Sequence, residues 1–268
     1  MDPVIACNDM TKRFRDSERV VLDGVTLSVR PGEFVAVMGP SGSGKSTLLF
    51  ALSGMDRVDG GSVTFEGTEL TRLHEDALAG IRRRRMGFVF QQPTLLRNLD
   101  LLDNIVLPAV TDRGAFRSDV TDKARELMRR MGIEDLANRR ITQASGGQLQ
   151  RVGICRALIR DPAVIFGDEP TGALDSGTSA EIMALFNEIH RDGTTIVLVT
   201  HDTSVAARTE RVLYLLDGRL TGELFLGTYD GTETALTARD ERLIAWIAEG
   251  APHHHAVPHA TEVHGATE

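Results

Sequence analysis

The sequence of 268 residues lacks several features, and each absence removes a class of protein. No apolar run approaches the roughly 18 residues of a membrane-spanning helix, so we expect no transmembrane segment. The first residues form neither a basic region nor an apolar stretch, so we expect no secretory signal. There are only two cysteines, Cys7 and Cys155. They exclude a disulfide framework and favour two buried thiols in a reducing compartment.

An excess of basic residues is also missing. Lys and Arg together number 30 against 38 Asp and Glu, which gives a formal net charge of −8. Because general nucleic-acid binders carry a basic footprint, we expect no nucleic-acid partner. The remaining composition is that of an ordinary globular chain, long enough to bury a sizeable core.

Short apolar runs that alternate with helical patterns predict an α/β fold. Continuous apolar runs, typical of strands buried on both faces, occupy residues 34–38, 86–90, 163–166 and 195–200. Residues from about 95 to 159 have helical periodicity instead, for example over 119–131 and from 149 to 159. Further β-prone runs lie at 20–22, 25–29 and 62–65, and a hairpin is expected over 213–224. The sequence therefore predicts a parallel core with an antiparallel layer and an inserted helical block.

A phosphate-binding loop is predicted between the first continuous apolar run and a short helix at 47–52. Residues 39–46 read Gly-Pro-Ser-Gly-Ser-Gly-Lys-Ser and fit the pattern G-x-x-x-x-G-K-[ST] in the required context. The glycines let consecutive N–H groups turn toward phosphate oxygens, and the helix start adds a positive dipole end. The residues expected to hold the nucleotide are Gly39, Pro40, Ser41, Gly42, Ser43, Gly44, Lys45, Ser46 and Thr47. Lys45 can reach the β and γ phosphates, and the Ser46 hydroxyl can ligate Mg²⁺.

Two carboxylates follow the apolar run at 163–166. Ligand chemistry in open α/β sheets lies at the carboxyl ends of the strands, where Asp168 and Glu169 are expected. Asp168 suits a Mg²⁺ contact, and Glu169 suits orienting and deprotonating an attacking water. An apolar run that ends in Asp-Glu would by itself indicate a solvated loop, but the upstream phosphate loop favours the functional interpretation.

The residues between these motifs carry a family resemblance. Residues 144–148 read Ala-Ser-Gly-Gly-Gln, and here the sequence resembles the ATP-binding-cassette (ABC) ATPases, whose signature is LSGGQ. Three further motifs match in order: Gln91 the Q-loop glutamine, Asp175 the D-loop and His201 the switch histidine. The resemblance covers roughly residues 4–230, and ordered motifs are far more specific than any one alone. Ala144 replaces the usual leucine, a packing residue, and we expect activity to survive that change.

The resemblance implies ATP hydrolysis with Mg²⁺, which Ser46, Gln91 and Asp168 would ligate. Glu169, His201, Lys45 and Gln91 would act in catalysis, with Gln91 and His201 sensing the γ-phosphate. Two cassettes would dimerise head to tail, so that each signature covers the ATP of the other. The signature residues are Ser145, Gly146, Gly147 and Gln148. Phe14 stands where the family places an aromatic ring against adenine, although a plain core aromatic is the alternative.

The same resemblance implies a P-loop NTPase fold, with a RecA-like parallel core, an antiparallel β subdomain and an inserted helical subdomain. We assign the ABC ATPase domain to residues 1–230, with the core and β subdomain in 1–94 and 160–230 and the helical subdomain at about 95–159. A C-terminal helical extension is expected over 231–250. Residues 251–268, rich in Pro, His and Thr, are expected to be a disordered tail.

Residues 168–175 are similar to the MacB-like, lipoprotein-releasing and FtsE-like group of ABC ATPases, with Gly172 where polar amino-acid importers more often have Ser. The resemblance implies three partners: an integral membrane permease of the FtsX/MacB type, a second copy of the ATPase, and a periplasmic or lipoprotein partner. The chain would then be peripheral, at the cytoplasmic face of the inner membrane. We expect residues 93–102, beside Gln91, to receive a coupling helix of the permease, with an ordinary solvated loop as the alternative. The alternative function is a soluble ABC ATPase of the iron–sulfur-assembly type without a permease.

Overall fold

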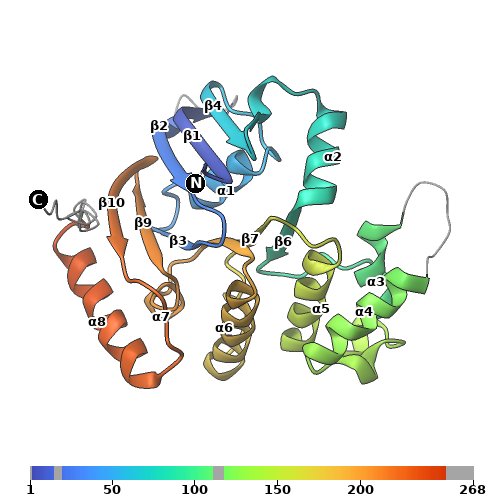
Figure 1. Ribbon diagram of the computed structural model, residues 1–268. Coiled ribbons are helices and arrows are strands. Elements are labelled where there is room, and N and C mark those ends of the chain that lie inside the picture. Colours follow the sequence, from blue (N-terminus) through green and yellow to red (C-terminus); the bar gives the residue numbers. More distant parts are fainter. Residues whose placement is uncertain (1, 15–19, 111–117, 252–268) are drawn as a thin grey trace, which may run out of the picture.

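The computed structural model describes residues 2–14, 20–110 and 118–251. The expected tail beyond residue 251 therefore lies outside the described residues. Two sheets form the body of the molecule (Figure 1). The larger sheet has the strand order β10-β9-β3-β8-β7-β6, and the smaller one, which is antiparallel, has the order β2-β1-β4-β5. Within the larger sheet β6, β7, β8, β3 and β9 are parallel and β10 pairs antiparallel with β9. The predicted α/β class, with parallel and antiparallel layers, is confirmed.

The elements of the described residues have the following bounds. The strands are β1 (Ile5–Arg13), β2 (Val20–Val29), β3 (Phe34–Met38), β4 (Gly60–Phe65), β5 (Thr68–Glu69), β6 (Met86–Phe90), β7 (Val164–Asp168), β8 (Thr195–Val199), β9 (Arg211–Leu216) and β10 (Arg219–Phe225). The α-helices are α1 (Lys45–Leu52), α2 (Glu75–Arg85), α3 (Leu101–Val106), α4 (Ser118–Arg130), α5 (Gly146–Leu158), α6 (Ser176–Arg191), α7 (Thr203–Ala206) and α8 (Glu233–Ala248). Short 3₁₀ turns are η1 (Leu70–Arg72), η2 (Leu107–Ala109), η3 (Glu134–Leu136) and η4 (Ile141–Gln143).

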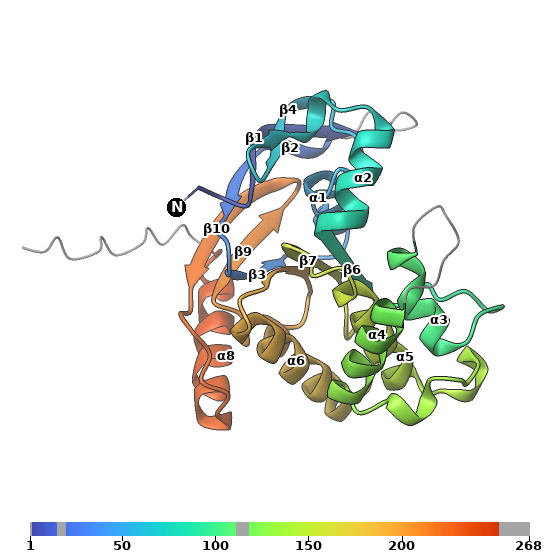
Figure 2. The same ribbon diagram turned by 45° about the vertical axis from the view of Figure 1, so that its right-hand side comes forward.

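The central sheet is buried on both faces, and alternate residues of its strands belong to different cores. In β3, Phe34 and Ala36 contribute to a cluster with α3, α4, α5, α6 and α8, whereas Val35 and Val37 contribute to a cluster with α1 and the antiparallel sheet. Figure 2 shows α1 between the two sheets, with α5, α6 and α8 on the other side of the central sheet. This two-sided burial explains why continuous apolar runs predicted these strands.

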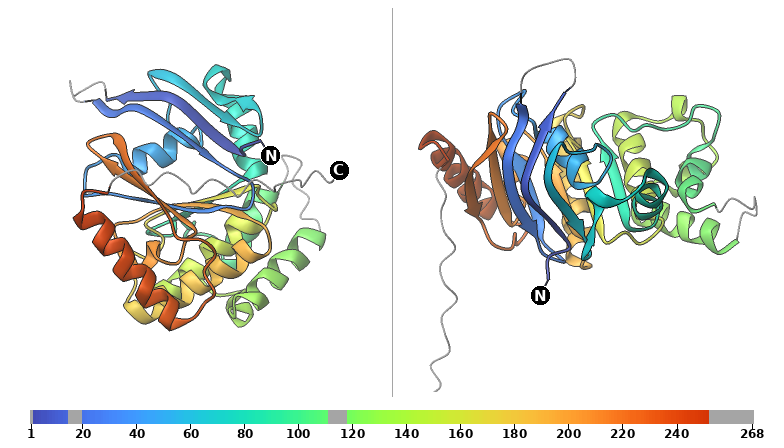
Figure 3. Two further views of the ribbon diagram at one scale, coloured as in Figure 1. Left: turned by 60° about the vertical axis from the view of Figure 1, so that its left-hand side comes forward. Right: turned by 90° about the horizontal axis from the view of Figure 1, so that it is seen from above.

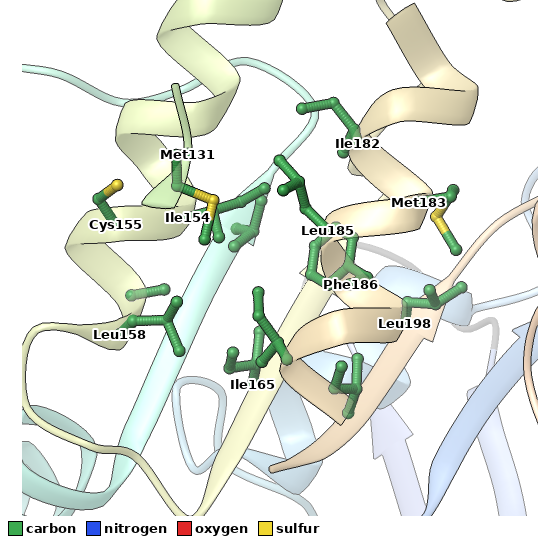
Figure 4. Close-up of a cluster of buried hydrophobic side chains, with 14 of the residues drawn as sticks. Met131, Ile154, Cys155, Leu158, Ile165, Ile182, Met183, Leu185, Phe186 and Leu198 are labelled. Carbon is green, nitrogen blue, oxygen red and sulfur yellow. The ribbon is translucent and has the colours of Figure 1, made fainter. Parts of the chain in front are cut away.

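The helix-covered face packs through large aliphatic and aromatic side chains. In Figure 4, Ile154 and Leu158 of α5 and Phe186 of α6 surround Ile165 of β7. Cys155 lies in the same cluster, and Cys7 lies in the cluster on the opposite face. Both thiols are free and buried, as predicted, and burial raises the pKa of Cys7 to about 11 and of Cys155 to about 12.

The helical block lies to one side of the sheets, at the opposite end from α8 (Figure 3). It consists of α3, α4, α5 and the turns between them, and α4 carries the periodicity expected over 119–131. The block has less helix than predicted near its start, because residues 93–100 form irregular structure and α3 begins only at Leu101. Asp100 caps α3 by accepting a hydrogen bond from the Asp103 N–H at 2.7 Å, which fixes where the helix begins.

The antiparallel sheet differs from the expectation in two respects. The runs at 20–22 and 25–29 are one strand, β2, and the pattern gave no signal for its partner β1. The pairing of β1 with β2 shifts register between Cys7 and Met10 and again near Lys12. Such irregularities break the strict alternation that identifies a strand in a sequence.

The C-terminal helix α8 lies within the extension expected over 231–250, and one arginine fixes it to the core. Arg239 of α8 donates hydrogen bonds to the carbonyl oxygens of Ala207, at 2.6 Å, and of Gly227, at 3.0 Å. It also donates to the carbonyl oxygens of Leu226, Thr228 and Thr209. Ala251, which we assigned to the tail, is instead fully buried. None of the helices in the described ranges is long and apolar enough to cross a membrane.

Replacing Arg239 with Met should therefore destabilise the fold. The substitution leaves several carbonyl groups without donors, and we expect it to lower the free energy of unfolding by roughly 2–3 kcal/mol. Arg242, exposed on the same helix, provides the matched control Arg242→Met, which should change stability by less than about 0.5 kcal/mol. Urea unfolding followed by circular dichroism measures both, and equal stabilities of the two variants would contradict the anchoring role of Arg239.

Candidate functional site

The predicted phosphate loop leaves β3 and enters α1, and two of its glycines leave no room for a side chain. Gly39 has φ 151°, and a Cβ placed there would lie 2.0 Å from the carbonyl oxygen of Leu215. Gly44, with φ 102°, would bring a Cβ to 2.8 Å from the carbonyl oxygen of Val21. The loop is therefore pressed against β9 and β2, and this close approach holds its backbone in a fixed curve.

Lys45 folds back over the loop that precedes it. Its Nζ donates to the carbonyl oxygens of Gly39, at 2.8 Å, and Pro40, at 2.9 Å. Burial lowers the pKa of Lys45, and the nearby carboxylates of Glu169 and Asp168 oppose this shift. The ammonium group therefore sits in the loop beside the two acidic residues that follow β7.

One polar atom of the loop indicates that the site fits a phosphate. The hydroxyl oxygen of Ser43 is buried and has no hydrogen-bond partner among the described residues. A buried hydroxyl without a partner is costly, and a phosphate oxygen in the loop would satisfy it. The residues present thus fit a nucleotide phosphate.

The structure brings Ser46 and Asp168 together although 122 positions separate them. The Ser46 hydroxyl donates to Asp168 Oδ1 at 2.8 Å. Burial raises the pKa of Asp168, and the Ser46 hydrogen bond opposes that rise. A hydroxyl and a carboxylate beside a phosphate loop are suitable ligands for Mg²⁺, which prefers oxygen and keeps several waters.

Gln91 lies near this pair but contacts a different part of the site. It follows β6, whose last residue Phe90 pairs with Asp168. A Cβ at Gly172 would lie 3.0 Å from Gln91 Nε2, so the glutamine side chain rests on the turn after Glu169. The predicted ligand Gln91 is thus adjacent to the site rather than hydrogen-bonded to Ser46 or Asp168.

Glu169 and His201 are in direct contact at the edge of the sheet. His201 Nδ1 lies 2.8 Å from Glu169 Oε1. The Glu169 backbone has φ 47°, an unusual value for a non-glycine residue, and its N–H donates to the carbonyl oxygen of Val199 at 3.0 Å. An open hollow of about 480 Å³ adjoins the pair and is lined partly by α6 and α7. This arrangement can hold a carboxylate near a reacting water while the imidazole orients it.

The predicted signature lies against the start of α6. Ser145 and Gln148 form a capping box at the start of α5: the Gln148 N–H donates to Ser145 Oγ at 3.3 Å, and the Ser145 N–H donates to Gln148 Oε1 at 2.9 Å. A Cβ at Gly147 would lie 2.5 Å from Thr178 Cγ2, and one at Gly146 would lie 3.6 Å from Leu174 Cδ2. The contacts of the phosphate loop, by contrast, are with β2, β9 and the end of β7.

Asp175 and Phe14 also have defined surroundings. Asp175 caps α6 by accepting hydrogen bonds from the Thr178 N–H at 2.9 Å and the Thr178 hydroxyl at 2.7 Å. Phe14 is 47% exposed, with Lys12 Nζ 5.6 Å from the centre of its ring. The alternative that Phe14 is a core aromatic is therefore wrong, and its ring is open to stacking.

Sequence reasoning missed Gln150, a polar residue on the buried face of α5. Its side chain is 1% exposed and donates to the carbonyl oxygens of Phe90 at 3.0 Å and Pro170 at 2.6 Å. The one available signal was an amide between the apolar residues Leu149 and Val152, in a stripe expected to pack into the core.

Residues 22–172 match a family described as ABC transporter. The chain is 47% identical over 256 residues to the macrolide export ATP-binding/permease protein MacB of Chlorobaculum tepidum, which covers 90% of the chain and 39% of that protein. The MacB of Hahella chejuensis is 40% identical over 256 residues, 92% of the chain and 39% of that protein. The chain thus spans about two fifths of the length of these curated relatives.

Solved structures agree with these relatives. A dimeric post-hydrolysis state of the ATP-binding cassette MJ0796 bound to ADP and Pi matches with a TM-score of 0.77 at 40% identity, over 84% of this chain and all of that one. CbiO1 from Clostridium perfringens, part of an ABC transporter complex, matches with a TM-score of 0.76 at 25% identity, over 91% of this chain and 95% of that one. The predicted P-loop NTPase fold is confirmed.

The close approach of Gly39 to the carbonyl oxygen of Leu215 leads to a testable prediction about the phosphate loop. Gly39→Ala should lower the free energy of unfolding by about 3 kcal/mol and abolish nucleotide binding, because the added carbon meets a backbone oxygen as well as an unfavourable φ. Gly67 has φ 77° with open space around it, so Gly67→Ala should cost only about 1 kcal/mol and leave binding intact. Urea unfolding and titration with a fluorescent ATP analogue test the pair. Normal nucleotide binding by the Gly39 variant would contradict the fixed curve of the loop.

Proposed function

The chain belongs to the ABC transporter family and is an ATP-hydrolysing cassette, and from that premise we propose that it drives a membrane permease through ATP-dependent closure of a cassette dimer. The observation that carries this proposal is the meeting of two pairs at one sheet edge beside the phosphate loop: Ser46 with Asp168, and Glu169 with His201. One pair suits a metal ion on the phosphates, and the other suits activation of water.

The phosphate loop would hold the triphosphate through its backbone N–H groups and Lys45. On binding, the Lys45 ammonium would leave the carbonyl oxygens of Gly39 and Pro40 for the phosphate oxygens, which its three donors also suit. Ser46 and Asp168, with Gln91 approaching, would hold Mg²⁺, which neutralises charge on the phosphates when bound. The exposed ring of Phe14 would stack on adenine.

Hydrolysis needs a base and a group that recognises the γ-phosphate. Glu169 would accept a proton from the attacking water while the water oxygen bonds to the γ-phosphorus and the bond from that phosphorus to the bridging oxygen breaks. ADP and inorganic phosphate leave. His201, whose Nδ1 lies 2.8 Å from Glu169 Oε1, would orient that carboxylate, and its other nitrogen would face the γ-phosphate.

A dimer would supply the second phosphate contact. The signature, residues Ser145, Gly146, Gly147 and Gln148, offers a hydroxyl and helix-start N–H groups, but packs against α6 of its own chain. We infer that it covers the ATP bound by a second copy, and that the γ-phosphate joins the two copies until hydrolysis removes the link. The similar cassette MJ0796, which is dimeric in a post-hydrolysis state bound to ADP and Pi, supports this arrangement.

The segment after Gln91 would contact the permease. Asn104 is fully buried, and its side-chain oxygen accepts a hydrogen bond from the Leu96 N–H at 2.7 Å. Its Nδ2 donates to the carbonyl oxygens of Leu96 at 3.1 Å and Asp100 at 2.8 Å. The backbone is therefore pinned, while the Leu96 side chain remains 45% exposed, as does that of Leu107. A pinned segment with exposed leucines favours a docking surface over an ordinary solvated loop.

The relatives favour a permease of the FtsX/MacB type. Those compared above are named ATP-binding/permease proteins, which supports coupling to a membrane component and disfavours a soluble ATPase of the iron–sulfur-assembly type. We propose that such a permease holds this chain at the cytoplasmic face of the inner membrane, with a periplasmic or lipoprotein partner beyond it. Co-purification of an integral membrane protein distinguishes this function from the soluble alternative.

Glu169→Gln tests the proposed base. The substitution keeps the size of the side chain but removes the proton acceptor, so we expect turnover to fall by roughly 10³-fold while ATP binding persists and the dimer is trapped. Phosphate release and light scattering with ATP measure the two effects. Lys45→Ala is the control, because it should weaken ATP binding itself and give no dimer at the same ATP concentration. Turnover at the wild-type rate in Glu169→Gln would overturn the assignment.

Charged substitutions test the docking segment. Leu95→Glu combined with Leu96→Glu should release the chain from its permease, because a charge cannot enter an apolar interface without cost, whereas basal ATPase activity should persist. Ile244→Glu, an exposed position on α8, is the matched control and should leave the complex intact. Affinity purification from detergent extracts with parallel ATPase assays gives both readouts. If the double variant retains the permease, the docking surface lies elsewhere.

A further inference from the structure

The side chain of Gln150 joins three segments that each carry part of the site. It extends from α5, two residues after the signature residue Gln148. Its Nε2 group donates one hydrogen bond to the Phe90 carbonyl oxygen at 3.0 Å and a second to the Pro170 carbonyl oxygen at 2.6 Å. Phe90 immediately precedes Gln91, and Pro170 immediately follows Glu169. Through one amide group, the signature helix therefore contacts the residue before Gln91 and the residue after Glu169.

These two carbonyl groups lie where the parallel ladder between β6 and β7 stops. The last residues in register are Phe90 and Asp168, so beyond them β6 and β7 no longer pair with each other. Gln150 supplies the donors that the ladder lacks at this point. Because its side chain is 1% exposed, water does not compete for these bonds.

The hydrogen bond from Gln150 to the Pro170 carbonyl oxygen matters because Pro170 lies in the turn that follows Glu169. The Gly172 N–H donates to the Glu169 carbonyl oxygen at 3.0 Å, which closes a tight turn, and proline restricts the backbone within it. Glu169 itself has φ 47°, a conformation that its surroundings must enforce. A donor fixed on the Pro170 carbonyl oxygen contributes to that enforcement.

We propose that Gln150 is a positioning residue that fixes the turn carrying Glu169 relative to the signature helix, so that it supports hydrolysis and not ATP binding. The proposal rests on the proposed function of Glu169 as the base. Only an amide of this length has two N–H donors for the two carbonyl groups: glutamate has no donor, and leucine has no polar group.

Gln150→Leu should lower kcat by roughly 10- to 100-fold with an unchanged KM for ATP, because displacing a catalytic group affects the chemical step. Gln150→Glu should act in the same direction. Asn187 provides a matched control, because its buried amide donates to the Met183 carbonyl oxygen at 2.9 Å, within the same helix α6. Asn187→Leu should change stability but not kcat. Thermal unfolding and nucleotide-binding stoichiometry give the folded fraction of each variant, to which kcat is referred.

A double-mutant cycle separates positioning from general damage. In the Glu169→Gln background, single-turnover hydrolysis should be no slower with Gln150→Leu than without it, because the group that Gln150 positions is already removed. An equal fold loss in both backgrounds, a raised KM with unchanged kcat, or wild-type kcat in Gln150→Leu would overturn the role of Gln150. Failure of the proposed base is distinguishable, because it would appear as wild-type turnover in Glu169→Gln alone.

Discussion

The burial of β3 on both faces is the constraint on which the rest of the structure depends. The strand is hydrogen-bonded along both edges, to β8 and to β9, and its side chains alternate between two separate cores. A slip of one residue would exchange Val35 and Val37 with Ala36 and Met38 and disrupt both cores at once, so the register is fixed. The end of β3 fixes the start of the phosphate loop, and the turn between β9 and β10 holds that loop: the Gly218 N–H donates to the Ser43 carbonyl oxygen at 3.1 Å. The register of the sheet therefore determines the position of the phosphate loop.

Parallel strands explain how distant residues meet at this edge. Because β3, β7 and β8 run in the same direction, the residues that follow their carboxyl ends are neighbours, which brings Ser46 to Asp168 and Glu169 to His201. Two groups with the chemistry to bind phosphate have partners within their own chain instead. Lys45 is satisfied by carbonyl oxygens of its own loop, and the signature caps its own helix. Both groups have the chemistry to bind phosphate, and both have intramolecular partners that a nucleotide and a second chain can replace.

The parts of the fold that could be predicted are those in which a short run of residues is enough to show where its segment lies in the structure. The apolar runs at 34–38 and 86–90 match β3 and β6 because strands buried on both faces need no alternation. The phosphate loop and the acidic strand end were identifiable because their chemistry requires fixed residue types. β1 was not predictable, since its register shifts mix exposed and buried residues irregularly. Gln150 and Arg239 were missed for a related reason. Each donates to main-chain carbonyl groups far away in the sequence, and because every residue has such a group, no residue type marks the partner.

Gly147 of the signature has a reason to be glycine within a single chain. A Cβ at Gly147 would lie 2.5 Å from Thr178 Cγ2. Thr178 cannot easily rotate away, because its hydroxyl donates to Asp175 at 2.7 Å and its N–H donates to the same carboxylate. The D-loop aspartate therefore locks a threonine methyl against the signature helix, while Gln150 joins that helix to the turn after Glu169. Two short-range contacts thus place the start of α5 against both the D-loop and the acidic strand end. If the signature covers the nucleotide of a second copy, as we propose, α5 cannot shift toward it without disturbing Asp175 and the turn after Glu169.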